Sequence, residues 1–297
     1  MPVPNPIASM NTPLTLQCRD LRCELLPALG GCVTGLWHGT QEVLRASPPA
    51  ALQSAWNASS YPLVPYSNRV GYRKLTWAGQ NFELTPNYPV EPHTLHGVGW
   101  TVPWQVQACS ATSAELLLQH AGNAAWPFAF ESTQTFTLAE DALEMHLSVT
   151  NRAAVPAPVG LGWHPYFAKR PQTHIRFAAQ SRWEMAADSL PTRSLPHAGL
   201  DTDCTNLQVD HCFSGWDGAL QLTDGPLTVR VTSDLNHLVV FTTPARDSIA
   251  VEPVSHVNNA LGLAAQMGVP PEQLGLRVLQ PGATFQASMR IHVEHTA

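Results

Sequence analysis

The chain has 297 residues, of which 44% are hydrophobic, so it can bury a large apolar core. Only 13% of the residues are charged, the formal net charge is −6, and no basic run is present; this argues against nucleic-acid binding, which needs a positive surface. The acidic balance gives no attraction to anionic lipid, and no apolar run is long enough to cross a bilayer, so we expect no membrane partner.

The start of the chain and its cysteines indicate the compartment. Residues 1–6 lack the basic region and the apolar segment of a signal peptide. Six cysteines occur without a CxxC pair or zinc-finger spacing: Cys18, Cys23, Cys32, Cys109, Cys204 and Cys212. In a chain of this length they are typical of small buried hydrophobic residues in a reducing compartment, so we expect a cytoplasmic protein.

Short apolar runs with period-2 alternation recur along the first half of the chain and are bounded by Gly, Pro, Asn and Asp. They predict two strands within 14–26 that join near Arg19-Asp20, and a hairpin over 75–84 that turns at 78–81. Further strands are predicted at 32–37, 104–109, 114–120, 128–138 and 143–151. The most regular alternation lies in 130–138, which predicts one buried and one exposed face.

The second half continues the pattern, with strands predicted at 159–163, 175–177, 182–185, 219–222, 227–232, 238–242, 249–252, 276–279 and 284–293. The best helix candidate is 259–267, which Gly268 follows. The Pro-rich stretches 47–50 and 188–203 predict long surface loops. Many short strands separated by turn residues predict an all-β fold, a large antiparallel sandwich with few short helices; without a linker, we expect a single domain over 1–297.

The first string with chemical potential is 61–70 (YPLVPYSNRV). Its two prolines keep the backbone extended and disfavour a central strand. Asn68 and Arg69 end the string, and the planar guanidinium of Arg69 is suited to sugar hydroxyls or a ring oxygen. Arg69 could equally tie down a loop through backbone carbonyls, and the string alone does not decide between these roles.

The second string, 93–100, contains two histidines three residues apart, which raises the question of a metal site. The HxH pair and following glutamate of a cupin-type site are missing, so we expect no metal. His96 precedes Gly-x-Gly-Trp and is placed to point from a turn into a cleft, whereas we expect His93 to be a solvated loop residue.

The third string is 160–167 (GLGWHPYF), which sets one histidine among aromatic residues. Pro165 favours an extended backbone at His164, so we expect His164 at the end of a strand. Aromatic surfaces can pack against a pyranose, and an imidazole can exchange a proton near neutral pH. The alternative is a structural histidine in the β core.

Two acids stand out in the last third. Asp210 precedes an apolar patch and could accept hydrogen bonds from sugar hydroxyls, or could serve as a cap or turn residue. Glu252 ends an apolar strand before Pro253, where burial is costly for an acid and raises its pKa toward that of a base useful near pH 7. The alternative for Glu252 is an edge residue that reaches solvent.

Taken together, these strings resemble the aldose 1-epimerase (galactose mutarotase) family. The matching parts occur in the family's order and span about 14–293: 62–70 with its Asn-Arg, 95–97 (LHG), 162–167 with its His-x-Tyr-Phe, Asp210, and Glu252-Pro253. The resemblance implies a β-supersandwich with an open cleft and with neither metal nor cofactor. It also implies a small-molecule aldose of the galactose or glucose class as substrate, bound by a monomer or a homodimer.

The resemblance assigns roles residue by residue. Glu252 is similar to the family's catalytic base, His164 to its catalytic acid, and His96 to its second active-site histidine. Sugar-binding positions are matched by Asn68, Arg69 and Asp210. Many members have a Gln and then a Pro-Asp-Ala run after the glutamate, whereas this chain has PVSHVNNA at 253–260, which leaves the preferred aldose open.

The implied chemistry is mutarotation, in which a base takes the proton of the anomeric hydroxyl while an acid protonates the ring oxygen. As a hypothesis, ionised Glu252 is the base and protonated His164 the acid, each favouring the charged form of the other. One alternative is a hexose-6-phosphate mutarotase, which needs a cluster of basic residues near C6 of the sugar. Arg73 and Lys74 are close to Arg69 in sequence, but a cluster is not evident.

Three other functions remain as alternatives. Glu252 and Asp210 could be the paired carboxylates of a glycoside hydrolase, although the context of His164 argues against it. A carbohydrate-binding module would keep the aromatic residues and Arg69 without needing both Glu252 and His164. A metal-dependent cupin-like enzyme has the least support.

Overall fold

The computed structural model describes residues 12–295, which form large antiparallel β-sheets, as predicted. The first sheet has twelve strands. Ten of them follow the order β1 (Leu14–Cys18), β2 (Leu21–Leu26), β3 (Cys32–His38), β4 (Gln41–Leu44), β16 (Tyr166–Ala168), β25 (Ser248–Val254), β24 (His237–Thr242), β21 (Val209–Ser214), β18 (Ser181–Met185) and β19 (Pro191–Pro196). The other two are β15 (Gly162–Trp163), which pairs with β25, and β5 (Pro62–Leu63), which pairs with β15.

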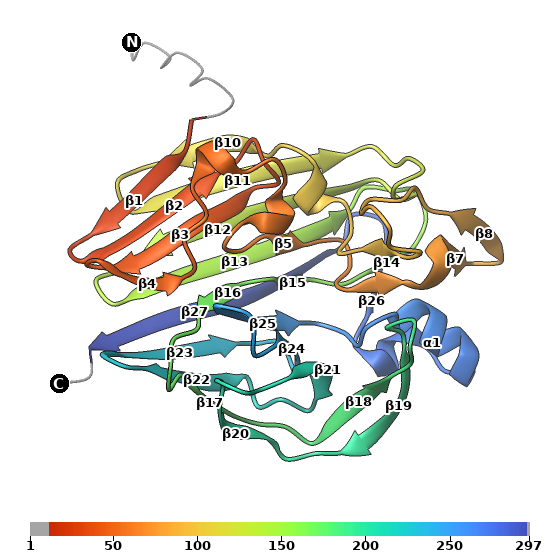
Figure 1. The fold of residues 1–297 in the computed structure, drawn as a ribbon. Helices are drawn as coiled ribbons and strands as arrows, with labels where there is room; N and C mark the ends of the chain where they lie inside the picture. The colour runs from red at the N-terminus through yellow and green to blue at the C-terminus, as the bar shows by residue number, and fades with distance from the viewer. Residues whose placement is uncertain (1–11, 296–297) are drawn as a thin grey trace, which may run out of the picture.

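The second sheet has nine strands. Their order is β10 (Gln105–Cys109), β11 (Ser113–His120), β12 (Phe130–Leu138), β13 (Ala142–Asn151), β27 (Thr284–His295), β23 (Leu227–Ser233), β22 (Ala219–Asp224), β17 (His174–Ala178) and β20 (Gly199–Asp203). Figure 1 shows strands of the two sheets lying against each other along the molecule, with β1–β4 beside β10–β13.

Short elements complete the fold at the margins of the sheets. Three two-stranded pairs join β14 (Ala157–Val159) to β26 (Arg277–Leu279), β6 (Arg69–Val70) to β9 (Thr94–Leu95), and β7 (Lys74–Trp77) to β8 (Gln80–Glu83). The helix α1 (Ala260–Met267) lies beyond β26 at the right of Figure 1. The 3₁₀ turns are η1 (Pro49–Ala51), η2 (Ala55–Asn57), η3 (Gly71–Arg73), η4 (Gly99–Thr101) and η5 (Pro271–Leu274).

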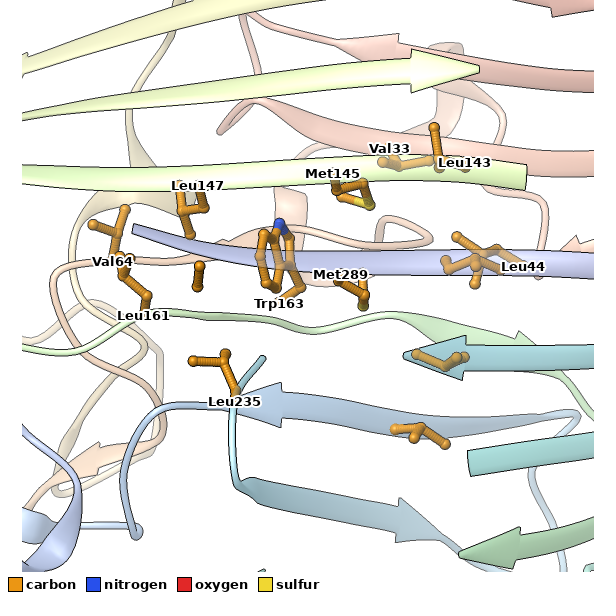
Figure 2. Close-up of a cluster of buried hydrophobic side chains, with 14 of the residues drawn as sticks. Val33, Leu44, Val64, Leu143, Met145, Leu147, Leu161, Trp163, Leu235 and Met289 are labelled. Carbon is orange, nitrogen blue, oxygen red and sulfur yellow. The ribbon is translucent and has the colours of Figure 1, made fainter. Parts of the chain in front are cut away.

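The main core lies between the two sheets and follows from strand alternation. On β13, Leu143, Met145 and Leu147 are buried, while Glu144 and His146 between them are not. Successive side chains of a strand point to opposite faces, so one face of β13 is apolar throughout. Figure 2 shows that face meeting side chains of the other layer and of the connections: Val33, Leu44, Val64, Leu161, Trp163 and Leu235.

A second apolar cluster covers the outer face of the first sheet, and β25 contributes to both clusters. Ile249 and Val251 belong to the core between the sheets, whereas Ala250 and Val254 belong to the outer cluster. A strand that is covered on both faces needs apolar residues at successive positions. This explains the uninterrupted apolar run before Glu252 and places its side chain on the outer face, with Ala250 and Val254.

Several local predictions are confirmed. Strands β1 and β2 join at Arg19-Asp20, and β7 and β8 form the predicted hairpin. The helix predicted over 259–267 is α1, and Gly268 ends it in the left-handed region with φ of 67°. All six cysteines are free thiols, but the prediction that they are buried is wrong for Cys109, which is exposed, and for Cys18, which is half-buried. Among residues 12–295, no helix is long and apolar enough to cross a membrane.

The prediction of a surface loop over 188–203 is wrong, because two strands lie there. Strand β19 is the edge of the first sheet, β20 is the edge of the second, and most of their side chains are exposed or half-buried. Pro191 and Pro196 bound β19. An exposed edge strand lacks the apolar alternation of a covered strand and tolerates proline, so its sequence resembles that of a loop.

The core predicts the stability effect of Leu147→Ala. Leu147 is fully buried between the sheets, so the truncation should lower the free energy of unfolding by about 2–5 kcal/mol. Leu195→Ala is the matched control, because Leu195 is 38% exposed on β19 and should change stability by less than about 0.5 kcal/mol. Urea unfolding measures both; equal effects would contradict the assigned core.

Candidate active site

The proposed acid and base face each other across two strands of the first sheet. Tyr166 of β16 pairs with Ala250 of β25, and Gly162 of β15 pairs with Val254. Continuing either register by two residues sets His164 directly opposite Glu252. Their side chains meet, with His164 Nε2 3.1 Å from Glu252 Oε1.

Two prolines interrupt the ladder at this pair. The backbone N–H groups of Val251 and Ser255 donate to the carbonyl oxygens of Pro165 and Leu161, at 3.1 and 2.8 Å. Pro253 lies between these donors and has no N–H to give, and Pro165 has none on the facing strand. The missing donors separate β15 from β16 and leave His164 in the gap, directly after β15, as predicted.

The structure corrects the predicted position of Glu252. It does not end its strand but lies inside β25, where it is 2% exposed, so it does not reach solvent at an edge. Its Oε2 atom is buried and has no hydrogen-bond partner among residues 12–295. A buried carboxyl oxygen without a partner is costly, and a polar ligand in the pocket would satisfy it.

Two tyrosines fix the orientation of the His164 ring. The ring stacks between Tyr61, at 4.8 Å between centroids, and Tyr166, at 4.6 Å, with interplanar angles of 28° and 29°. The backbone N–H of His164 also donates to the carbonyl oxygen of Tyr61 at 3.0 Å. The imidazole is therefore held on both faces, and only its edge is free to meet another group.

His96 is fixed as a neutral donor. Its Nδ1 accepts from the backbone N–H of Asn68 at 3.0 Å, so the proton of the neutral ring is on Nε2. Burial, and then the charge of Arg69, lower the pKa of His96 to about 3. The turn that holds it requires Gly97, since a Cβ there would lie 2.2 Å from the carbonyl oxygen of Val64.

Asn68 holds Arg69 through side chains. The Asn68 Oδ1 accepts from Arg69 Nη1 at 3.3 Å, and Arg69 Nε lies 3.5 Å from Glu91 Oε1. The side chain of Arg69 thus makes no bond to a backbone carbonyl among residues 12–295, which was the alternative role left open by the sequence. Both Asn68 and Arg69 line the same pocket as Glu252.

Asp210 lies on β21, a strand that the sequence did not predict, and pairs there with Phe241. Its side chain is exposed at the mouth of the pocket. Loss of water to the surrounding protein nevertheless raises the pKa of Asp210, while Arg69 and His211 oppose that shift.

All six residues assigned from the resemblance line one cavity of about 260 Å³: Asn68, Arg69, His96, His164, Asp210 and Glu252. A larger hollow of about 600 Å³ lies over β17, β20 and β22 and contains none of them. Convergence of separate polar groups marks a binding site better than volume does, so we take the smaller cavity as the candidate site.

Burial is the largest influence on the protonation of the pair, and it opposes the charged form of both partners. Burial, and then the charge of Asp210, raise the pKa of Glu252 well above its ordinary value. Burial, and then His96, lower the pKa of His164. Loss of water therefore favours a carboxylic acid beside a neutral imidazole in the empty pocket. The ion pair of carboxylate and imidazolium carries the same number of protons as this neutral pair. One proton transfer from Glu252 to His164 converts the neutral pair into the ion pair.

The sequence missed several residues that line the site. Trp56 and Tyr88 pack at 4.2 Å between ring centroids and form one wall. Arg45 and Arg246 also line the pocket, over the rings of Tyr166 and Phe241. Trp56, Tyr88, Arg45 and Arg246 lie on turns or connections, where no strand pattern or motif singles them out.

The segment 253–260, which departs from the family pattern, contacts the loop that carries Asn68. None of residues 253–260 lines the pocket. Instead His256 Nε2 accepts from the backbone of Ser67 at 3.0 Å, and Asn259 Oδ1 accepts from Gly71 at 2.9 Å. The segment that departs from the family pattern therefore supports the loop that carries Asn68 and does not itself line the pocket.

His93 is also corrected: it is fully buried, not solvated. Its Nδ1 accepts from the backbone of Tyr72 at 2.8 Å, and its Nε2 is 2.9 Å from the carbonyl oxygen of Asp188. His93 is therefore a structural residue that joins the backbone at Tyr72 to that at Asp188. Within the described part of the chain, no three His, Cys, Asp or Glu side chains gather closely enough to hold a metal ion.

Comparison with known proteins gives consistent matches. A family model described as aldose 1-epimerase matches residues 15–292. The uncharacterised protein YphB of Escherichia coli K12 is 30% identical over 282 residues, covering 89% of this chain and 93% of YphB. The crystal structure of an E. coli K12 protein, provisionally described as an aldose 1-epimerase, matches with a TM-score of 0.86 at 28% identity, covering 96% of this chain and 99% of that one. A galactose mutarotase-like protein of Clostridium acetobutylicum shares the fold, with a TM-score of 0.82 at 15% identity and 95% coverage of each chain.

The buried histidines predict acid sensitivity of the fold. Burial lowers the pKa of His96 to about 3 and those of His237 and His256 to about 4, and it also lowers the pKa of His164. Between about pH 4 and 6.5 the unfolded chain therefore binds more protons than the folded one. Glu252 opposes this by one proton, since its pKa is raised. As the pH is lowered through this range, the free energy of unfolding should decrease by about 1.4 kcal/mol per pH unit for each additional proton that the unfolded chain binds.

Urea unfolding at pH 7, 6 and 5 measures this slope. His256→Gln should make it shallower by about one proton, whereas the control His146→Gln, at an exposed position of β13, should leave it unchanged. A stability that is constant over this range would show that these histidines are charged in the fold.

Proposed function

Because the chain belongs to the aldose 1-epimerase family, we propose that it interconverts the α and β anomers of an aldose, with Glu252 as base and His164 as acid. The observation that carries this proposal is the contact of 3.1 Å between these two side chains in a pocket of sugar-compatible size. Ring opening needs a proton acceptor and a proton donor at one end of the same molecule, and the pair supplies both.

The proposed cycle begins with one proton moving from Glu252 to His164, which creates carboxylate and imidazolium without a change in total charge. Glu252 then takes the proton of the anomeric hydroxyl, and His164 gives its proton to the ring oxygen as the bond between that oxygen and C1 breaks. The open aldehyde rotates about the bond from C1 to C2. Reversal of both transfers closes the other anomer.

The remaining polar residues have binding roles in this proposal. His96 donates from Nε2, because its Nδ1 accepts from Asn68, and no carboxyl group among residues 12–295 contacts it to supply a proton as Glu252 does for His164. Arg69 donates to oxygen atoms of the sugar and is held in place by Asn68. Asp210 at the mouth accepts from hydroxyls remote from C1. The aromatic pair Trp56 and Tyr88 offers an apolar wall to the ring.

Glu252→Gln tests the base. The amide keeps the size of the side chain but cannot accept the proton, so anomer exchange should fall by about 10²–10⁴-fold while sugar binding persists. The measurement is NMR exchange spectroscopy on a panel of α-aldoses that includes galactose and glucose. Glu115→Gln, exposed on the second sheet, is the matched control and should keep the wild-type rate.

The same panel separates the alternatives. A near-normal rate in Glu252→Gln would remove Glu252 from the chemistry, and His164→Asn applies the same criterion to the acid. Binding of sugar without faster exchange in the wild type would indicate a carbohydrate-binding module. Release of reducing sugar from an aryl glycoside would instead support a hydrolase that uses Glu252 and Asp210.

A further inference from the structure

Two arginines at one end of the pocket have no acidic partner. Arg45 follows β4, Arg246 lies between β24 and β25, and both line the cavity with Glu252 and His164. No carboxylate among residues 12–295 forms an ion pair with either of them. The third arginine of the pocket, Arg69, is paired with Glu91.

The two guanidinium groups lie over rings carried by β16 and β24, the strands on either side of β25. Arg45 lies 3.7 Å from the ring centroid of Tyr166, and Arg246 lies 4.5 Å from that of Phe241. Tyr166 and Phe241 pair with Ala250 from its two sides. Ala250 precedes Glu252 by two residues on the same face of β25, so the level of the sheet that carries the two rings is about 7 Å along the strand from that of Glu252.

Burial is the main influence on Arg45 and lowers its pKa. Tyr166, Tyr61 and Asp247 oppose this shift, whereas the like charge of Arg246 adds to it. The Nη2 of Arg45 donates to the carbonyl oxygen of Ala58 at 2.9 Å, while its Nε is buried without a partner. An oxyanion accepts several guanidinium N–H bonds at once, so it would satisfy this donor and offset the repulsion.

The contact between His164 and Tyr166 indicates which part of a bound sugar would lie near Arg45 and Arg246. His164 is the proposed donor to the ring oxygen and stacks on Tyr166, over whose ring Arg45 lies. The ring oxygen joins C1, which faces Glu252 in the proposed reaction, to C5, which bears the exocyclic C6 group of a hexopyranose. With C1 at Glu252 and the ring oxygen at His164, we expect a group on C6 to point toward Tyr166 and the arginine over its ring.

We propose that Arg45 and Arg246 bind an oxyanion, a phosphate or a carboxylate, carried at C6 of the aldose. This inference rests on the proposed epimerase function, because the position on the ring follows from the role of His164. The structure also removes the earlier basic candidates: Arg73 pairs with Glu83, and neither Arg73 nor Lys74 lines the pocket.

A bound oxyanion would also assist the acid. Arg45 and Arg246 both contribute to lowering the pKa of His164, after burial and His96. An anion between them offsets their charge, so the pKa of His164 rises and its protonated form becomes more populated. The anionic group should therefore increase kcat as well as lower KM.

Binding is tested first with sugars that cannot epimerise. 1,5-Anhydroglucitol lacks the anomeric hydroxyl, and calorimetry should show its 6-phosphate binding at least tenfold more tightly than the neutral compound, with the difference decreasing at high salt. Arg246→Gln should remove most of that difference. Arg193→Gln, exposed on β19, should preserve the difference. Equal affinities for the two compounds in the wild type would overturn the proposal.

Anomer-exchange NMR on glucose, glucose 6-phosphate and glucuronate then identifies the anion, after subtraction of the spontaneous rates. We expect kcat/KM for one of the charged sugars to exceed that for glucose by at least tenfold, and Arg246→Gln to abolish this preference. Fast exchange of glucose without advantage for either charged sugar would overturn the anion site and leave the epimerase proposal intact. Tight binding of the 6-phosphate without exchange of any sugar would overturn the epimerase proposal and support the anion site.

Discussion

The site depends on one cross-strand pair, His164 opposite Glu252, in an interior part of the first sheet. A carboxyl and an imidazole at this depth lose most of their hydration, and burial therefore opposes the charged form of each. Their contact and the stacking of His164 between two tyrosines compensate in part. The unpartnered oxygen of Glu252 shows that the empty site is not fully satisfied, which is typical of a place prepared for a polar ligand.

The sequence predicted the architecture because the strands of the sandwich show their burial directly. On β12, alternate residues are buried as the pattern indicates, and the hairpin of β7 and β8 follows from its turn residues. Prediction failed where a strand is not covered on one face, as on β19 and β20. It also failed on β21, where Asp210 and His211 interrupt the apolar pattern. A residue that faces a polar pocket breaks the signal that would identify its strand.

The sequence also brought together the six site residues, but only because their strings occur in the order of a known family. Spacing along the chain could not show that His164 and Glu252 lie in one register, since that depends on the pairing of β15 and β16 with β25. It could not show Arg45 or Arg246 either, because each is an isolated arginine on a connection. The sequence could not predict the protonation of His164 and Glu252 either, because their pKa values depend on burial, which is a property of the fold.

The division of the pocket between sheet and connections has a consequence for how such a protein diverges. Glu252 and Asp210 are carried by strands, and His164 lies between two strands of the same sheet, so moving them would disturb the ladder. Arg45, Trp56, Tyr88 and Arg246 are carried by turns and connections. Descendants of one ancestor can therefore exchange these contacts for others by local substitution and acquire new sugar preferences, while the inherited reaction centre is conserved in place.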